Sequence, residues 1–464
     1  MCDENKIQSG CCPHRRGPAC ATEPRRPHDR AGPEVPPDRT AAAGCQVRPS
    51  RHVRAAQRNG WTIAEWIGDR RPDATQRLLN RARWDTAGAT STVRRFAVAR
   101  LDAAARSGSL TVGVLDESGQ EKKGVATAGV KRQHMGCAGG IDNGVNTVYL
   151  AYVRARAGHA LIGARQWIPA EQISDPVTAI TTGLPLDLTF ATKGELAIDL
   201  LREAYADNVR LDFVTGDEVY GACTKLRTFL EERGQAYVLR IRATFTLTLG
   251  GGTCLTCAQA VAKHLRQKRR WTIRSAGAGS KGERTYAWAW IATASSAHFL
   301  LVRKHRTTGE VAFHYCFVPA GQPVTLARLV SAAGLRWPVE ESFQAGKDLF
   351  GLDQSQVRLH QALLRHLVLV MAALAVCAVT AAAARHGTDT QVNRPTHPDE
   401  APPADPGLIP LTVAEVKGLF NAVTGRTPTL EHAAHWSAWR RRHQARARWF
   451  HHRARLSTAY IQLN

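Results

Sequence analysis

Two aspartates stand where a metal-dependent reaction on a phosphodiester would need them. Asp116 ends the β-rich segment LTVGVLD (110–116), and Asp217 ends the similar segment LDFVTGD (211–217). We predict a strand for each segment, which makes both carboxylates project from the carboxyl edge of a sheet, where open α/β sheets usually place their ligands. Two such aspartates can share hard divalent cations. Because acidic residues at strand ends are also common turn formers and helix caps, these two positions alone do not define a site.

A third acidic residue, Glu340, lies in the segment RWPVEESFQAGK (336–347). On a helix that turns 100° per residue, Arg336, Glu340 and Lys347 fall within about 40° of one another, whereas Glu341 points elsewhere. Such a stripe suits a carboxylate that holds metal at a phosphodiester while flanking cations bind neighbouring phosphates. An ordinary surface pair of Arg and Glu at i, i+4 is the alternative interpretation.

The composition favours a polyanionic partner and a location inside the cell. The chain has 464 residues, of which 44% are hydrophobic, so it can bury a large core and form two or more units. Its 62 Lys and Arg against 39 Asp and Glu give a net charge of +23. Nucleic acid is the first partner to consider, although membrane headgroups attract the same charge. The eleven cysteines are not spaced as a disulfide framework and no secretory signal is recognised, so we expect a cytoplasmic protein associated with the nucleoid.

One segment argues for a membrane and must be weighed. Residues 367–384 form an uncharged run of 18 residues, at the lower limit of the roughly 17–25 residues that span a bilayer. Eight of the 18 residues are alanine, and basic residues flank both ends, so neither strong insertion nor an orientation is specified. A buried core helix is the favoured interpretation, and we expect no membrane association.

The elements that must position these residues alternate along the chain. Strand patterns at 110–116, 146–155 and 159–169 are followed by helix, strand, helix and strand at 194–207, 211–217, 222–233 and 236–244. This order indicates an α/β fold, a mixed sheet with flanking helices in the arrangement of an RNase H-like core.

The remaining segments complete a predicted domain organisation. Residues 1–50 are rich in Pro, Arg, Gly and Cys without a periodic apolar face, so we expect them to be disordered or atypical. A helical unit spans 51–105, with Arg77, Arg81 and Arg83 on a polar side that is either solvated or in contact with DNA. The predicted catalytic core is 106–390, with a β-rich insertion at about 245–330, followed by a Pro- and Asp-rich linker at 391–408 and a basic C-terminal region at 409–464. A helix is expected to begin near Pro338.

The motifs around the three acidic residues resemble those of the bacterial insertion-sequence DDE transposases. The family signature Tyr-x₂-Arg-x₃-Glu-x₆-Lys is matched by Arg336, Glu340 and Lys347, while Ala333 stands at the tyrosine position. VLDESGQEKKGVATAGVKRQ resembles the block around the first aspartate, and VTGDEVYG the block around the second. The resemblance extends from about residue 58 to 456.

The resemblance implies an enzyme that cleaves DNA at transposon ends and transfers the strands into target DNA. In such an enzyme, Asp116, Asp217 and Glu340 would hold two Mg²⁺ ions, for which Mn²⁺ can substitute. The double-stranded partners would be the terminal inverted repeats and the target, and synapsis of two ends implies a homodimer. The implied DNA-binding residues are Arg336, Lys347, Lys122, Lys123, Trp288 and Trp290.

Several alternatives remain open at this level. Trp288 and Trp290 lie on one predicted strand and are candidates to stack on an extruded base, but a core tryptophan is the commoner role. Cys254, Cys257 and His264 form only half of a zinc site. With Ala333 in the signature, an inactive or repurposed transposase that only binds DNA is the alternative function.

Overall fold

The computed structural model describes the backbone of residues 58–279, 282–391, 401, 403–425 and 427–463, all within one compact unit that begins at Ala55. Side chains are described as far as residue 455. The atypical segment expected at 1–50 and most of the linker expected at 391–408 lie outside the described residues.

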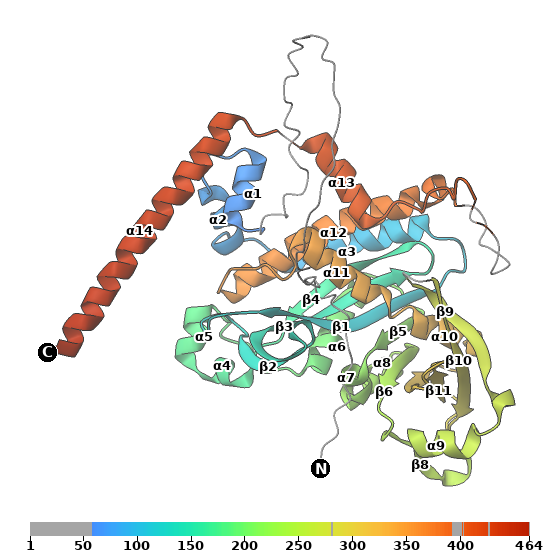
Figure 1. The fold of residues 1–464 in the computed structure, drawn as a ribbon. Coiled ribbons are helices and arrows are strands. Elements are labelled where there is room, and N and C mark those ends of the chain that lie inside the picture. Colours follow the sequence, from blue (N-terminus) through green and yellow to red (C-terminus); the bar gives the residue numbers. More distant parts are fainter. Residues whose placement is uncertain (1–57, 280–281, 392–400, 402, 426, 464) are drawn as a thin grey trace, which may run out of the picture. The chain divides into compact units, whose positions relative to one another are not determined.

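A ten-stranded mixed sheet forms the centre of the described unit (Figure 1). Its order is β2-β3-β1-β5-β6-β12-β11-β10-β9, and β4 also pairs with β3. β1 is parallel to β5, and β5 to β6, whereas the other pairs are antiparallel. The strands are β1 (Thr111–Glu121), β2 (Lys131–Met135), β3 (Gly140–Arg154), β4 (Gly158–Gln166), β5 (Phe213–Gly216), β6 (Tyr237–Ile241), β9 (Thr272–Gly279), β10 (Gly282–Ala292), β11 (His298–Lys304) and β12 (Val311–Phe317).

The region expected as a β-rich insertion continues the main sheet. β12 pairs with β6 from Tyr237↔Phe317 to Ile241↔Phe313, so β9–β12 extend the sheet that carries β1 and β5. The same region also contains a separate two-stranded sheet of β7 (Thr246–Thr248) and β8 (Cys254–Thr256), and the helix α9 (Cys257–His264). The insertion is therefore joined through backbone hydrogen bonds to the sheet that carries Asp116 and the end of β5.

Helices cover both faces of the sheet, which makes the fold a mixed α/β structure. One core cluster joins Val112 and Val114 of β1 to α10 (Leu326–Gly334), α11 (Pro338–Phe350) and α12 (His360–Thr388). The other joins Leu115 to α6 (Lys193–Ala206) and α8 (Thr224–Glu232). This division follows the alternation of side chains along β1, since successive residues face opposite sides of a sheet. The short helices α4 (Ala170–Ser174), α5 (Pro176–Thr182) and α7 (Glu218–Ala222) lie in connections between the strands.

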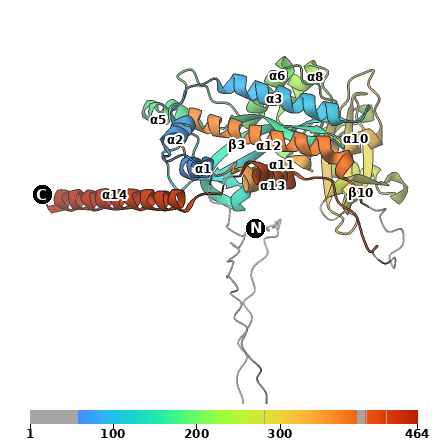
Figure 2. The ribbon, with the colours of Figure 1, turned by 90° about the horizontal axis from the view of Figure 1, so that it is seen from above.

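Helices also occupy the stretch from residue 60 to 104, where a helical unit was expected. They are α1 (Gly60–Ile67), α2 (Asp73–Asn80) and α3 (Thr86–Ala104). Asn59 caps α1 with a capping box, and Asp85 caps α3. α3 runs beside α12, as Figures 1 and 2 both show, and buries Ala97 and Leu101 in the core.

The apolar run at 367–384 lies inside α12, a helix of 29 residues that is long and apolar enough to cross a membrane by length and composition. In this structure 56% of its most apolar window is buried, and the helix packs against β4 and α3. His360 and Arg365 are buried on the same helix. These contacts are those of the core helix that the sequence analysis favoured.

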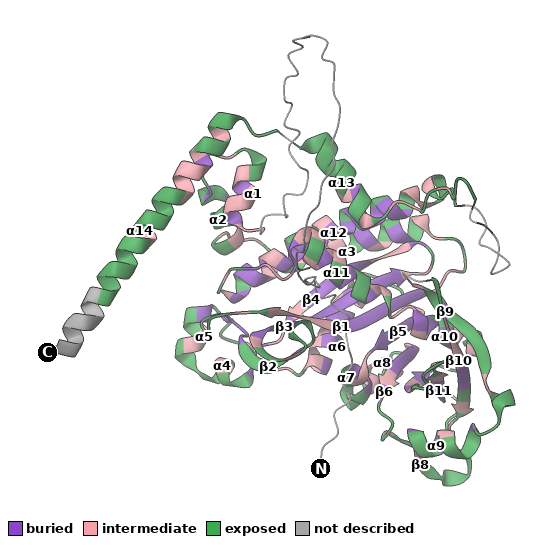
Figure 3. Cartoon of the chain, viewed as in Figure 1, coloured by how far each residue is buried: buried purple, intermediate pink, exposed green. Residues whose placement is uncertain are grey.

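The C-terminal basic region forms α13 (Val413–Thr424) and the long helix α14 (Leu430–Leu463). Along α14 most described side chains are exposed, as Figure 3 shows. Trp436 is the exception: its side chain is fully buried, and its indole N–H donates to the carbonyl of Asp69, 2.9 Å away. Arg440 pairs with Glu65 at 2.5 Å, so the first turns of α14 are attached to α1.

Candidate active site

Asp116 and Asp217 occupy equivalent positions on neighbouring strands. The parallel pairing of β1 with β5 ends at Leu115 and Gly216, and each aspartate is the next residue of its chain segment. Neighbouring strands lie about 4.8 Å apart, so the two carboxylates start from adjacent backbone positions. The prediction that Asp116 ends its strand was wrong, because β1 continues to pair with β3 as far as Glu121. The edge at which the carboxylates meet is created by the end of β5.

Asp116 is the more buried of these two carboxylates. Its Oδ1 accepts a hydrogen bond from the backbone N–H of Glu117 at 2.8 Å, and its Oδ2 lies 2.5 Å from Nη1 of Arg336. Burial raises the pKa of Asp116; Arg336 opposes the rise, but the charges of Glu340 and Asp217 add to it, and the pKa is about 6. The ionised form of a buried carboxyl group beside two other acids requires a nearby positive charge to be stable.

Arg336 supplies positive charge to two of the three predicted triad members. Its Nη2 lies 3.7 Å from Oε1 of Glu340, so one guanidinium bridges Asp116 and Glu340. Burial alone would lower the pKa of Arg336, but Asp116, Glu340 and Asp217 raise it above its usual value. The bridge joins the glutamate helix α11 to strand β1.

The predicted stripe Arg336–Glu340–Lys347 is only partly helical. α11 begins at Pro338, as expected, which leaves Arg336 in the turn between α10 and α11. Trp337 of this turn has helical dihedrals (φ −56, ψ −40), and this explains why Arg336 and Glu340 still approach each other across four positions. Lys347 lies in the last turn of α11, half-buried, and forms no ion pair with a described carboxylate.

The oxygen donors of this site suit a hard divalent cation. As the side chains stand, no three His, Cys, Asp or Glu residues in the described ranges converge closely enough to enclose a metal ion. However, Arg336 already bridges two of the carboxylates, and the donors are oxygens, which Mg²⁺ prefers. The side-chain oxygens Glu117 Oε2, Thr215 Oγ1 and Tyr220 Oη are buried beside the site without a hydrogen-bond partner among the described residues. The residues therefore fit a metal.

Asp217 is held by the helix that follows it. It is the N-cap of α7, and its Oδ1 accepts from the backbone N–H of Val219 at 2.9 Å. Gly221 allows α7 to approach β6, since a Cβ at this position would lie 1.8 Å from the carbonyl oxygen of Arg240. Close packing of α7 on β6 thus fixes the direction of the Asp217 carboxylate.

Two arginines on the extended sheet, Arg240 and Arg303, lie close enough to Arg336 for the charges to act on Arg303, and the sequence analysis did not identify them. Arg240 of β6 pairs with Glu218 at 3.2 Å, and the guanidinium of Arg303 on β11 lies 4.6 Å from the ring centroid of Tyr286. Burial lowers the pKa of Arg303, and the charges of Arg240 and Arg336 lower it further. Each arginine interrupts an otherwise apolar strand pattern, and this could have marked both residues in the sequence. Their proximity could not be predicted, because it depends on the pairing of both strands with β12.

Lys122 and Lys123 lie past the site on the β1–β2 connection. Burial lowers the pKa of Lys122 to about 8, and its amine donates to the carbonyl of Ser355. Lys123 is exposed. Of the two predicted phosphate contacts, Lys123 therefore has its amine available in this structure, whereas Lys122 is engaged with the loop after α11.

The two tryptophans predicted as base-stacking candidates lie in different surroundings. Trp288 is 1% exposed and belongs to the core cluster, so its ring faces are covered and the DNA-contact assignment is corrected to the alternative core role. Trp290, two residues along β10, is 37% exposed and stacks on Phe299 with 5.1 Å between ring centroids. Only Trp290 presents a surface that a base could reach.

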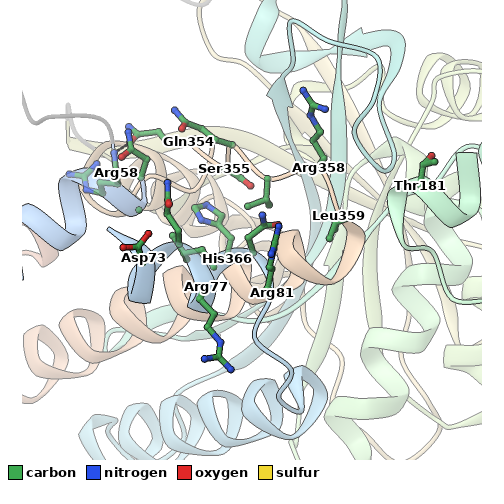
Figure 4. Close-up of a pocket in the computed structure, with 17 residues that line it drawn as sticks. Arg58, Asp73, Arg77, Arg81, Thr181, Gln354, Ser355, Arg358, Leu359 and His366 are labelled. Carbon is green, nitrogen blue, oxygen red and sulfur yellow. Dashed lines mark hydrogen bonds between the residues drawn. The ribbon is translucent and has the colours of Figure 1, made fainter. Parts of the chain in front are cut away.

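A basic pocket lies between the N-terminal helices and the loop after α11. Its volume is about 870 Å³, and four arginines line it (Arg58, Arg77, Arg81 and Arg358) against one acidic residue, Asp73. Figure 4 shows His366 near its centre, with the guanidinium groups of Arg77 and Arg358 directed outwards at opposite margins. A neighbouring cavity shares Gln354, Ser355 and Arg358 with this arginine pocket and contains Lys122 and Lys123. The two cavities form a continuous basic surface at the C-terminal end of α11.

Fold and site together define a mixed α/β protein in which Asp116 and Asp217 follow the end of the parallel pairing and Arg336 links Asp116 to Glu340. The sequence model of the DDE superfamily endonucleases matches residues 53–289, just over half of the chain, and the chain belongs to this family. Asp116 and Asp217 lie inside the matched range, and Glu340 lies beyond it.

Comparison with other proteins adds no closer identification. No curated protein matches the chain. Among solved structures, the chain is similar to a protein described as the piggyBac transposase in a synaptic complex with hairpin DNA, with 11% identity and a TM-score of 0.29. The match covers 60% of this chain and 47% of that chain, which is less than half of its length.

Proposed function

We propose that this protein is a DDE transposase, which cleaves DNA at the ends of a mobile element and joins the released strands to target DNA in a metal-dependent reaction. The observation that carries the proposal is that Asp116 and Asp217 follow the end of the same parallel pairing, while Arg336 links Asp116 to Glu340. Membership of the endonuclease family supports the cleavage half of the reaction.

The order of the central strands supports an RNase H-like catalytic core. β3 and β1 are antiparallel neighbours, and β5 and β6 follow as parallel strands on the other side of β1. The order of the sequence elements predicted a mixed sheet with flanking helices, and the RNase H-like assignment is part of this proposal. We assign the catalytic core to residues 106–390 and propose that the helical stretch within 51–105 contacts transposon-end DNA.

The three carboxylates would hold the metal, for which Mg²⁺ is the best match to an all-oxygen donor set. When bound, a pair of such ions stabilises the attacking and leaving oxygens of an in-line displacement at phosphorus. Arg336 neutralises Asp116 and Glu340 in the protein alone, and a DNA phosphate is a competing anionic partner for its guanidinium. Burial of Asp116 beside this arginine keeps the site ordered before substrate arrives.

The partner we propose is double-stranded DNA, as terminal inverted repeats and as target. Lys347, Lys123 and the arginine pocket provide cations at the C-terminal end of α11, and each phosphate contact formed there would release condensed counterions. Synapsis of two ends requires two active sites, so we propose a homodimer. The matches to the bacterial insertion-sequence signature support a bacterial origin and a cytoplasmic, nucleoid-associated protein.

The test is a cleavage assay on duplex DNA that carries the terminal repeats flanking the coding sequence, with and without Mg²⁺. We expect Asp116→Asn, Asp217→Asn and Glu340→Gln each to lower the rate at least 100-fold. Glu341→Gln is the matched control, since this neighbouring carboxylate pairs with His159 and not with Arg336. Cleavage by any triad variant at the wild-type rate would remove that residue from the site.

A second candidate function is that of a repurposed protein that binds DNA without cutting it. Ala333 favours it, because this small apolar residue stands where the signature has tyrosine. Under this alternative, the wild-type protein binds the terminal repeat but gives no Mg²⁺-dependent cleavage. Restoring the signature by Ala333→Tyr would then be the next variant to assay for cleavage.

A further inference from the structure

A second basic cavity lies at the opposite end of the glutamate helix from the arginine pocket. We call it the hairpin groove, because the turn of the β3–β4 hairpin forms one of its walls. Its volume is about 940 Å³, and it is lined by five arginines against two glutamates. The C-terminal ends of α3 and α12 and part of β9 complete its walls. Trp337 and Glu341 at the start of α11 also line it, so the groove reaches the helical turn that carries Glu340.

Three arginines of the hairpin groove have no acidic partner among the described residues. Arg106 follows the end of α3, Arg156 lies in the hairpin turn, and Arg385 lies in the last turn of α12. Arg106 and Arg156 are exposed. The other two lining arginines are held by the fold: Arg154 pairs with Asp102, and Arg284 donates to the carbonyls of Ala276 and Gly334. The groove therefore carries positive charge that the fold itself leaves unpaired.

Two of these arginines have local features that point to a ligand. The Nε of Arg385 is buried and has no hydrogen-bond partner among the described residues, which is unfavourable for a donor. Arg156 has a positive φ of 65°, a conformation that is uncommon for residues other than glycine. The dipole at a helix C-terminus explains a cation at position 385, but it does not explain an arginine in a strained hairpin turn.

We propose that the hairpin groove binds the phosphate backbone of the target DNA, while the element end is bound from the arginine-pocket side. The inference rests on the proposed function, because joining requires two DNA segments at one set of carboxylates. The two basic cavities lie at the two ends of α11, whose first turn carries Glu340. Each segment then approaches the carboxylates from its own side.

The first test measures binding of a labelled 30-base-pair duplex without terminal repeats, by fluorescence anisotropy across a salt series. The groove variant is Arg106→Gln/Arg156→Gln, and the matched control is Arg95→Gln/Arg210→Gln, which removes two exposed cations that do not line the groove. Loss of two phosphate contacts should reduce the steepness of the plot of log binding constant against log salt concentration by about 1.8. A slope equal to that of the wild type, or an equal loss in the control, would overturn the proposal.

The second test separates target binding from the chemistry. Cleavage of end DNA by the groove variant should stay within twofold of the wild type, while joining of precleaved ends to a plasmid should fall at least tenfold. If cleavage and joining fall together, the groove binds the element end, and the assignment to target DNA is wrong. If the wild-type protein does neither reaction, the proposed function fails, and the anisotropy series still decides whether the groove binds DNA.

Discussion

Removing the charge of Asp116 should stabilise the metal-free protein. The pKa of this carboxyl is about 6 in the folded protein, against 3.8 for the ordinary group, a difference of about 2.2 units. At about 1.36 kcal/mol per unit, ionising Asp116 in the fold costs about 3 kcal/mol. We therefore expect Asp116→Asn to unfold at a higher temperature than the wild type at pH 7.5 in EDTA. The gain should be smaller than 3 kcal/mol, because Arg336 loses one of its two carboxylate partners.

The sign of the pH dependence follows from the raised pKa. Between about pH 4 and pH 6 the folded protein binds more protons at Asp116 than the unfolded chain does, so stability falls as the pH rises through this window. The free-energy cost of ionising Asp116 in the folded protein is complete above pH 6 and absent below pH 4. The advantage of Asp116→Asn should therefore be largest at neutral pH and should shrink as the pH is lowered toward 4.

The assay is thermal unfolding in EDTA at a series of pH values. Tm moves by roughly 2–4 °C per kcal/mol in domains of 150–250 residues and by less in larger ones, so we expect a rise of about 2–5 °C at pH 7.5. Glu341→Gln is the control, for which we expect a change in Tm of the opposite sign. The pKa of the Glu341 carboxyl is lowered, mainly by the hydrogen bond with His159, so removing this carboxylate should reduce stability at neutral pH. Added Mg²⁺ should stabilise the wild type more than Asp116→Asn. A lower Tm for Asp116→Asn at pH 7.5, or a gain independent of pH, would refute the reasoning.

Three further predictions concern the elements around the site. Arg94 is buried between Glu203 and Asp207, so Arg94→Met should lower the free energy of unfolding by about 3–5 kcal/mol in urea titrations, and a loss below about 1 kcal/mol would contradict this role. Gly221→Ala should displace α7 and lower both Tm and cleavage, whereas Gly418→Ala, which meets open space, should leave both unchanged or raise Tm. Trp288→Ala should cost about 3–5 kcal/mol of stability, and Trp290→Ala should cost markedly less; equal losses would show that the two rings are not packed as described.

Local sequence patterns were sufficient to predict the elements that carry the site. The strands around Asp116 and Asp217 and the start of the glutamate helix at Pro338 are found where hydrophobic runs and a proline predicted them. Each of these signals lies within a few consecutive residues. β2 (KRQHM) was not predicted, because it is short and largely polar and forms only one pairing, with β3.

The parts that could not be predicted depend on which distant segments pair. Asp116 marks the end of a parallel pairing rather than the end of its strand, and only the partner strands decide where that pairing stops. Likewise, Trp288 and Trp290 face the same side of β10, but the packing around each ring makes one buried and the other half-exposed. An alternating pattern predicts which side chains share one face of a strand. Residues that are remote in sequence decide whether that face is covered.

The pairing of β12 with β6 has an electrostatic consequence for the site. It sets Arg240 and Arg303 on the two strands that flank β12, with the half-buried His314 opposite Arg240 in the register. Burial, together with the charges of Arg303 and Arg240, lowers the pKa of His314 to about 3, so this imidazole is neutral and adds no charge. Arg336 contributes a third cation to the same neighbourhood. Arg240 and Arg336 help to lower the pKa of Arg303, whereas the pKa of Arg336 itself is raised by Asp116, Glu340 and Asp217. The cationic neighbourhood around Arg336 is thus a product of the β12–β6 pairing, and the proposed DNA phosphate would place an anion beside it.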